Sequence, residues 1–367
     1  MKATPDVSET PTASGLDGLV VAHTALSDVD GEQGRLVIRG YAVEDLVARA
    51  TFEDVCGLMW DGAFPPAEAR EKMRAALARA REQAFALVPG LGDALDAADG
   101  MEALRAATGH VRATGDATDR VQLTGAIGVF AAAWARKQAG HAPVAPSPSL
   151  SHAADILRMI DDAAASPARV KALDAYLCCV VDHGMNASTF TARVVASTGS
   201  DLVSAVVAAI GALKGPLHGG APGPVLDMLD AIGTRERARP WLEGEINARR
   251  RIMGMGHRIY RVRDPRAAAL ERAASEFEQS GAATDRLTMA RHVEREAEQL
   301  LAERHPDRPL KANVEFYTAV LLEAAGIPRT SFSPMFAASR VAGWCAHVEE
   351  QRQVGRLIRP ASKYVGP

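Results

Sequence analysis

The sequence predicts an all-α fold, because helical patterns cover most of the chain and strand patterns are rare. Residues 43–62 place apolar side chains at intervals of three and four, the repeat of a helix with one buried face. Residues 67–88 are rich in Ala, Arg and Glu, which have high helix propensity. The exception is Val37 and Ile38, which lie between glycines and predict a short strand or turn.

Capping and helix-breaking residues divide this pattern into elements. Thr51 is expected to cap a helix, because its hydroxyl can accept an unpaired backbone N–H, and Gly62 is expected to end that helix. Residues 140–151 combine proline and serine and predict a loop, with Ser149 or Ser151 as the cap of the following helix.

Two longer stretches carry most of the remaining helical signal. Residues 172–215 predict two apolar helices joined around residues 182–186, and their apolar content indicates burial on most sides. Residues 267–304 predict a polar, amphipathic helical stretch.

The composition is that of an ordinary globular protein. The chain has 367 residues, of which 47% are hydrophobic and 24% charged, so we expect one large or two ordinary domains. A net charge of −3 gives no general reason to bind nucleic acid or an anionic membrane. The longest apolar stretches are shorter than the roughly 20 residues that span a bilayer.

The N-terminal segment and the cysteines bear on the cellular compartment that we expect for the protein. Residues 1–16 are polar, lack the apolar segment of a secretion signal, and are predicted to be a disordered lead. The four cysteines show no C-x-x-C spacing and are expected to be small core residues in a reducing compartment. We therefore expect a cytoplasmic protein.

Glu315 is the most unusual charged residue, because it lies between Val314 and Phe316 and apolar residues follow it. An unpaired buried charge is costly, and burial raises the pKa of a carboxyl group. Either Glu315 points outward, or it is held in place to move a proton.

Two histidines lie in glycine-rich segments. His218 is flanked by glycines that would let the backbone approach a ligand, although it could equally cap a helix at an ordinary turn. His257 follows Gly254 and Gly256 and precedes a run of arginines, which suit carboxylates and phosphates. That run could also be a solvated basic face.

The other histidines give weaker signals. His183 lies between apolar helices near Asp182 and Asn186, and a hydrogen-bonded core histidine is the simplest interpretation. His347 is expected to pack on an amphipathic helix, and the remaining six to lie on the surface or in loops.

Four segments in order resemble the citrate synthase family, and the resemblance extends from about Leu19 to Val365. It implies almost wholly helical homodimers whose smaller domain closes over the substrates. The implied division is a large domain of residues 17–218 and 321–367 and a small domain of residues 219–320. The segments are DHGMNASTFTARVVAST, GPLHGGAPGPVLDML, GMGHRIYRVRDPRA, and NVEFYTAVLLEAAGIP followed by FAASRVAGWCAHVEEQ and RLIRP.

The reaction that the resemblance implies condenses acetyl-CoA with oxaloacetate and then hydrolyses the citryl-CoA thioester, with no cofactor or metal. The acetyl methyl group is a very weak acid, so a positioned base and stabilisation of the enolate oxygen are needed. By the resemblance, Glu315 is the base, His218 hydrogen-bonds the thioester oxygen, and His257 donates to the oxaloacetate carbonyl.

The resemblance also assigns binding residues. His183, Arg266 and Arg340 match the family's oxaloacetate ligands, and Arg359 matches one that reaches across from the partner subunit of the dimer. Those expected to contact CoA are Arg261 for a phosphate, the backbone of Gly254, Met255 and Gly256 around the adenine, and Lys311, which is supported mainly by its charge.

The chain departs from the family pattern at three positions. The family commonly has aspartate at position 315, and a shift of about an ångström can cost of order a hundredfold in rate. Ala312 replaces a common proline, which could give the backbone freedom to accommodate the longer Glu315. Gly184 replaces an acid that commonly follows His183. The chain also has no room for the extra N-terminal domain of NADH-inhibited relatives, so no nicotinamide regulation is expected.

Three alternatives remain open. A 2-methylcitrate synthase would use the same residues with propionyl-CoA, and one methylene changes affinity by only about 1–3 kcal/mol. A non-catalytic paralogue could bind CoA or a dicarboxylate. A zinc site of His218, His257 and Glu315 is the third, although their spacing carries no metal signature.

Overall fold

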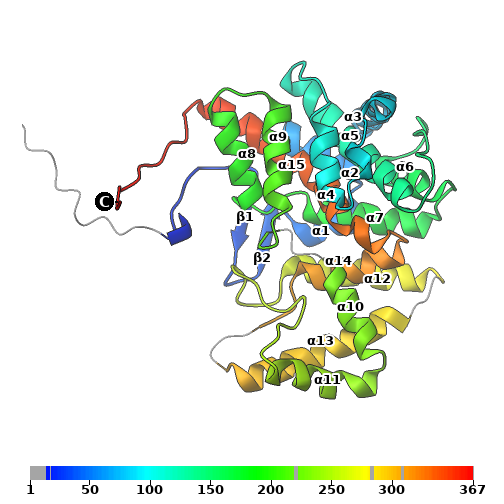
Figure 1. The fold of residues 1–367 in the computed structure, drawn as a ribbon, viewed down its shortest axis with the longest axis vertical. Helices are drawn as coiled ribbons and strands as arrows, with labels where there is room; N and C mark the ends of the chain where they lie inside the picture. Colours follow the sequence, from blue (N-terminus) through cyan, green and yellow to red (C-terminus); the bar gives the residue numbers. More distant parts are fainter. Residues whose placement is uncertain (1–13, 17, 219–221, 282–284, 307–309, 367) are drawn as a thin grey trace, which may run out of the picture.

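The computed structural model describes residues 14–16, 18–218, 222–281, 285–306 and 310–366. This part of the chain is predominantly helical, which confirms the predicted fold class (Figure 1). The α-helices are α1 Val43–Arg49, α2 Phe52–Asp61, α3 Ala67–Leu87, α4 Gly100–Thr108, α5 Asp116–Gln138, α6 His152–Asp161, α7 Pro167–Val180, α8 Ala187–Ser197, α9 Leu202–Leu213, α10 Gly223–Ile232, α11 Arg235–Asn247, α12 Pro265–Gln279, α13 Asp285–Arg304, α14 Val314–Ala324 and α15 Phe332–Val354. Short 3-10 turns occur at Ser14–Leu16, Val88–Gly90, Ala94–Asp96 and Arg329–Ser331.

A small antiparallel sheet precedes the first helix. Its strands are β1 Ser27–Asp30, β2 Arg35–Ile38 and β3 Tyr41–Ala42, in the order β1-β2-β3. The strand predicted at Val37 and Ile38 is therefore confirmed, and it is the middle strand of three.

The predicted helix ends are largely confirmed. Thr51 accepts the backbone N–H of Asp54 and forms a capping box at the start of α2, and Gly62 ends that helix in a left-handed conformation. Ser151, rather than Ser149, caps α6 by accepting the N–H of Ala154.

Two of the longer predictions need correction. Residues 172–215 form parts of three helices, because Asp201 caps a new helix, α9, with its carboxylate accepting the N–H of Ser204 at 2.7 Å. Residues 267–304 divide into α12 and α13, since α12 ends at Gln279, Ser280 is its C-cap, and Gly281 follows with φ +91°.

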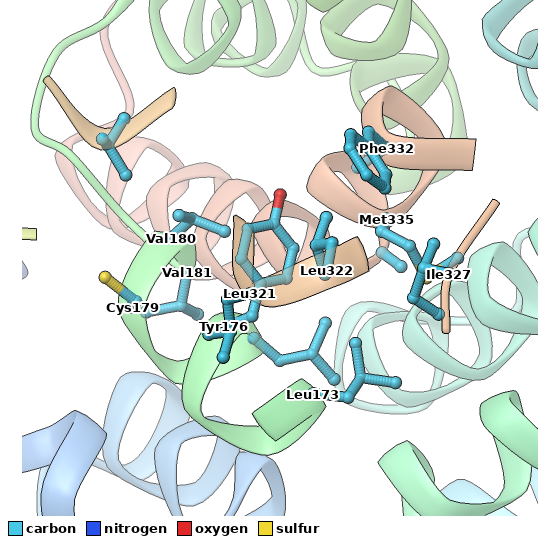
Figure 2. Close-up of a cluster of buried hydrophobic side chains, with 14 of the residues drawn as sticks. Leu173, Tyr176, Cys179, Val180, Val181, Leu321, Leu322, Ile327, Phe332 and Met335 are labelled. Carbon is cyan, nitrogen blue, oxygen red and sulfur yellow. The ribbon is translucent and has the colours of Figure 1, made fainter. Parts of the chain in front are cut away.

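The core lies where α7, α14 and α15 meet. α15 packs against α5, α7, α8 and α9, and its residues from Pro334 to Val348 are almost all buried. Figure 2 shows part of this core, in which Tyr176 of α7 lies among leucines of α7 and α14. All four cysteines are buried and form no disulfide, as expected.

Helices α10, α11 and α13 lie together on one side of the molecule, in the lower part of Figure 1. α11 packs against α13, whereas α12 packs against α14, α1 and α7. The predicted division into residues 17–218 with 321–367 and residues 219–320 stays a prediction.

Both ends of the chain extend beyond the helical body. The segment after α15 is extended, and in Figure 1 it leaves on the same side as the segment before β1. Most of the predicted disordered lead, residues 1–13, lies outside the described residues, and Ser14–Leu16 form a 3-10 turn. No described helix is long and apolar enough to cross a membrane.

Candidate active site

Helix ends and loops bring the predicted residues together. His183 lies between α7 and α8, His218 follows α9, and His257 precedes α12. The rings of His183 and His257 are 5.7 Å apart, and Tyr260 packs against both of them. His218 belongs to the same group, because a positive charge on its ring would lower the pKa of His183.

His257 is held as a neutral hydrogen-bond donor. Its Nδ1 accepts the backbone N–H groups of Ile259 at 3.0 Å and Tyr260 at 3.2 Å. Burial and the nearby Arg266 lower the pKa of His257 to about 4. The single proton of the neutral ring is therefore on Nε2, which lies 3.5 Å from Arg266 Nη2.

His218 has the opposite tautomer. Its Nε2 accepts the backbone N–H of Ser188 at 3.2 Å and lies 2.8 Å from the Ser188 hydroxyl, which itself accepts the indole N–H of Trp344 at 3.1 Å. Burial and Arg340 lower the pKa of His218 to about 4, so the neutral ring carries its proton on Nδ1. The alternative expectation of a capping histidine is also partly true, because Ser188 lies in the first turn of α8.

His183 is nearly inaccessible to solvent, and its Nε2 lies 3.0 Å from the Tyr260 hydroxyl. Burial lowers its pKa well below the usual value, and Arg266, Arg340, His257 and His218 lower it further. His183, Arg266, Arg340, His257 and His218 therefore act on one another as one cluster of positive and neutral groups.

Arg266 is fixed by a two-pronged ion pair with Asp264. Arg266 Nε donates to Asp264 Oδ1 at 3.1 Å and Nη2 to Oδ2 at 2.8 Å, and both side chains are buried. Asp264 also accepts the backbone N–H of Val314 at 3.2 Å, which joins the arginine to the start of α14. No described residue accepts from Nη1, so this nitrogen is available for a ligand.

Arg340 of α15 is also held in place, but by a backbone carbonyl rather than by an acid. Its Nε donates to the backbone carbonyl of Val180 at 2.6 Å, its guanidinium lies over the Phe336 ring, and its Nη2 is buried with no hydrogen-bond partner among the described residues. Burial lowers the pKa of Arg340 to about 10, and the charge of Arg266 contributes. Two buried guanidinium groups that repel each other favour a dianionic ligand between them.

Glu315 lies in the first turn of α14, where the Asn313 side chain caps the helix by accepting the Glu315 backbone N–H at 3.0 Å. Its carboxylate forms no hydrogen bond or ion pair with the described residues. Burial raises the pKa of Glu315 to about 7, against the lowering effects of Arg266 and Arg251. The expected rise in pKa is therefore confirmed.

The segment before Glu315 is less free than expected. Met255 and Ala312 form an isolated β-bridge, with Gly256 N–H donating to the Lys311 carbonyl at 2.7 Å and Asn313 N–H to the Gly254 carbonyl at 2.9 Å. Ala312 also donates its N–H to Glu298 at 3.4 Å, a bond that proline could not form. The bridge holds the segment in this position, and the accommodation of Glu315 by a backbone shift stays a prediction.

Backbone conformation and close contacts explain why glycine occupies position 254 in this bridge and position 184 in the loop that follows His183. Gly254 has φ +74°, and a Cβ there would lie 2.8 Å from Phe316. Gly184 has φ +59°, so an acidic residue at this position would be strained, and its N–H donates to Ser27 Oγ at 3.0 Å and Asp182 Oδ2 at 3.2 Å.

Three predicted residues lie away from the cluster. Arg359 is exposed on the extended segment after α15, so this chain alone does not bring it to the site. Arg261 is half exposed near Glu32 of the β1–β2 turn, with 4.0 Å between the charged atoms. Lys311 donates to Glu298 at 2.7 Å, so its charge is already paired.

The arginine run after His257 does not form one basic face. Arg263 pairs with Glu294 and Glu271, and Arg266 pairs with Asp264, so these two arginines each have acids of their own. Arg266 takes part in the cluster through its contact with His257. The suitability of the run for carboxylates and phosphates stays a prediction.

A buried network that the sequence did not reveal supports the His183 loop. Asp182 lies 3.1 Å from His347 Nε2 and accepts the Ser27 hydroxyl, and His347 Nδ1 lies 3.1 Å from Arg193. His347 and Arg340 lower the pKa of Asp182 to about 2 despite its burial. His347 is therefore not on an amphipathic face, since α15 is buried on nearly all sides.

His152 also contradicts the sequence interpretation. It was expected on the surface or in a loop but is completely buried in α6, 3.3 Å from Arg81, which pairs with Asp155 at 2.7 Å. The signal that could have found these residues is the combination of a histidine with an arginine and an acid in otherwise apolar helices.

The alternative of a zinc site gains no geometric support, because no group of three or more His, Cys, Asp or Glu side chains in the described ranges is arranged to hold a metal ion. A cavity of about 190 Å³ between α1, α7 and α12 is lined mainly by alanines together with Lys171 and Glu276. None of the predicted site residues lines it, and we place the site at the histidine and arginine cluster, where the chemically active groups converge.

Comparison with known proteins identifies the family. The family model "Citrate synthase, C-terminal domain" matches residues 15–361. The chain belongs to the citrate synthase family. A putative citrate synthase 2 from Mycobacterium tuberculosis is 40% identical over 96% of this chain and 92% of its own length, and a citrate synthase from Deinococcus radiodurans is 33% identical over 96% of each.

Solved structures of the citrate synthase family share the fold. The Thermotoga maritima citrate synthase aligns with a TM-score of 0.84 at 32% identity, covering 96% of this chain and 95% of that one. The Thermoplasma acidophilum enzyme, solved in a ternary complex with carboxymethyl coenzyme A and oxaloacetate, aligns with a TM-score of 0.85 at 26% identity, covering 96% of both chains.

Proposed function

We propose that this enzyme is a citrate synthase that condenses acetyl-CoA with oxaloacetate and hydrolyses the product thioester to citrate and CoA. The observation that carries the proposal is that Glu315, whose carboxyl group forms no hydrogen bond or ion pair with the described residues, is acted on by Arg266, which also lies 3.5 Å from His257 Nε2. His218 and His257 add two neutral histidines of opposite tautomer. The related Thermoplasma acidophilum enzyme was solved with a CoA derivative and oxaloacetate, which supports the same two substrates here.

In the first step, Glu315 removes a proton from the acetyl methyl group. A base whose pKa is about 7 is well matched to neutral pH, since it is partly deprotonated and still accepts a proton effectively. His218 donates its Nδ1–H to the thioester oxygen as negative charge develops there. Because the ring is neutral and held by Ser188, the donor is already oriented before the reaction.

In the second step, the enol carbon attacks the carbonyl carbon of oxaloacetate and a carbon–carbon bond forms. The carbonyl oxygen gains the electron pair of its π bond and takes a proton from His257 Nε2. The proton that Glu315 took from the methyl group is released to solvent, and solvent returns one to His257, so both residues regain their starting states. Water then cleaves the thioester of citryl-CoA, which releases citrate and the CoA thiol. The balanced reaction consumes one acetyl-CoA, one oxaloacetate and one water.

Oxaloacetate is a dianion, and we assign its carboxylates to Arg266 and Arg340, with His183 beside them. Burial of the three side chains implies that the site opens to admit the substrate. Arg359 would complete the site from a second copy of the chain, which fits its position on an extended and exposed segment. This part of the proposal requires a homodimer, and we expect it in the cytoplasm.

The CoA moiety would bind beside the 254–256 loop. Arg261 is half exposed and suits a phosphate, whereas Lys311 is the weaker candidate because Glu298 already neutralises it. Several backbone groups of Gly254, Met255 and Gly256 are hydrogen-bonded in the bridge to residues 311–313. Hydrogen bonds to an adenine would therefore come mainly from backbone groups that are outside the bridge, such as the Met255 carbonyl.

The test is the release of CoA thiol from acetyl-CoA and oxaloacetate by the wild type and by Glu315→Gln. The amide cannot accept the methyl proton, so we expect at least a hundredfold lower kcat, of order the contribution of a general base. Oxaloacetate binding, measured by calorimetry, should change little. Equal turnover by the two proteins would contradict the role of Glu315.

The same assay with propionyl-CoA separates citrate synthase from 2-methylcitrate synthase. A kcat/KM for propionyl-CoA above that for acetyl-CoA would replace the proposed substrate while leaving the assigned chemistry unchanged. Binding of oxaloacetate and CoA without thiol release would favour the non-catalytic alternative.

A further inference from the structure

Tyr176 of α7 is a buried polar residue that has no role in the mechanism described so far. Its side chain is completely buried, and Figure 2 shows its ring beside Leu321 and Leu322, with the hydroxyl on the side of the ring away from Leu173. The hydroxyl has no hydrogen-bond partner among the described residues. Since burial of an unpaired hydroxyl is costly, such a group calls for a function.

The same condition occurs at Arg340, whose Nη2 is also buried without a partner. Arg340 is anchored by its Nε to the carbonyl of Val180 at 2.6 Å, and Val180 lies one turn after Tyr176 on α7. α7 packs against both α14, which carries Glu315, and α15, which carries Arg340. Tyr176 therefore lies on the helix that joins the two sides of the cluster.

The charges around Tyr176 belong to the site. Burial is the main cause of its raised pKa, and Arg340 is the strongest charge that acts on the hydroxyl, with Glu315 and Arg266 also contributing. The hydroxyl therefore stays protonated at any pH at which the enzyme works and can donate a hydrogen bond.

We propose that the Tyr176 hydroxyl and Arg340 Nη2 together bind one carboxylate of the dicarboxylate substrate. A carboxylate offers about four acceptor positions on two oxygens, so it can satisfy both donors at once. A neutral donor is suitable here, because Arg340 and Arg266 already repel each other and a third cation would add to that repulsion. This inference rests on the proposed function, since it names a further ligand of the same substrate.

The variant Tyr176→Phe tests the proposal, because it removes the hydroxyl and keeps the ring. The dissociation constant for oxaloacetate, measured by calorimetry, should rise about tenfold to a hundredfold, the range expected for a hydrogen bond to a charged group. The KM for acetyl-CoA should stay the same. The midpoint of thermal unfolding without substrate should stay the same or rise, because the lost hydroxyl had no partner.

Tyr317→Phe is the matched control for stability. Tyr317 is also buried, but its hydroxyl donates to Glu294 at 2.5 Å, so its removal should lower the unfolding midpoint. An unchanged oxaloacetate affinity in Tyr176→Phe would overturn the proposal. So would a lowered unfolding midpoint without substrate, since it would show that the hydroxyl has a structural partner.

Failure of the proposed function gives a different result. If the wild type binds oxaloacetate but releases no CoA thiol, the catalytic proposal fails while the binding effect of Tyr176→Phe can still be measured. If the wild type does not bind oxaloacetate, both proposals are overturned.

Discussion

The proposed dicarboxylate side of the site, His183, Arg266 and Arg340, forms more hydrogen bonds within the protein than Glu315 on the proposed acyl-CoA side. Arg266 donates two hydrogen bonds to the Asp264 carboxylate, and Arg340 donates one to the backbone carbonyl of Val180. On the acyl-CoA side, the Glu315 carboxylate forms no hydrogen bond or ion pair with the described residues, and Arg261 and Lys311 are partly exposed. A small dianion must be oriented closely for attack, whereas a base must approach a substrate that enters and leaves.

Among the variants that test this difference, Asp264→Asn should have the largest effect on activity and stability. Removing one partner of a buried ion pair leaves an uncompensated charge and typically costs about 3–5 kcal/mol. We expect kcat/KM to fall about a hundredfold, mainly through a higher KM for oxaloacetate, together with a lower unfolding midpoint. Steady-state kinetics and thermal unfolding measure the two effects.

The control for this variant is Asp28→Asn, which removes an exposed partner of Arg35 and should change neither quantity measurably. An unchanged KM for oxaloacetate in Asp264→Asn would show that Arg266 is oriented without its acid. Binding of the dicarboxylate would then not depend on the hydrogen bonds that hold the arginines in place, and the proposed difference between the two sides would be lost.

A change of pH should have an intermediate effect on activity, because Glu315 is the proposed catalytic group whose protonation changes near neutral pH. Burial raises the pKa of Glu315 to about 7, and the base works only when deprotonated. We therefore expect kcat/KM for acetyl-CoA to level off above pH 7 and to fall about tenfold per pH unit below it. His218 and His257, with pKa values of about 4, remain neutral over this range.

Measurement of kcat/KM between pH 5.5 and 9 at saturating oxaloacetate checks this, with the range chosen as roughly two units either side of the pKa of Glu315. The affinity for oxaloacetate should be nearly constant over the same range, because the arginines that bind it keep their charge. A flat profile for acetyl-CoA would mean that Glu315 is deprotonated throughout, as an exposed carboxylate would be.

The smallest effect should come from Lys311→Ala. Because Glu298 pairs with Lys311, its removal should raise the KM for acetyl-CoA no more than about threefold, in keeping with the small contribution of a partly exposed ion pair. Arg261→Ala should raise it more, since Arg261 lies at a long distance from its acid. A larger effect for Lys311 than for Arg261 would reverse this ranking.

Much of the fold and part of the site could be predicted from local sequence. The caps at Thr51 and Ser151 and the central strand at Val37 were predictable, because each depends on neighbours a few residues away. The split of residues 172–215 into three helices depended on the Asp201 cap, which lies within an apolar run that obscured it.

The sequence by itself determined the helical class, the placement of Glu315 in an apolar segment and the residue types of a site for an anion. Only the tertiary structure decided which nitrogen of each histidine carries the proton, because Ser188 and the backbone at residues 259–260 are the partners that select it. It also decided that the Tyr176 hydroxyl is buried without a partner among the described residues. Ser188 lies 30 residues from His218, and burial on all sides exists only after the helices have packed, so no local pattern could contain either feature.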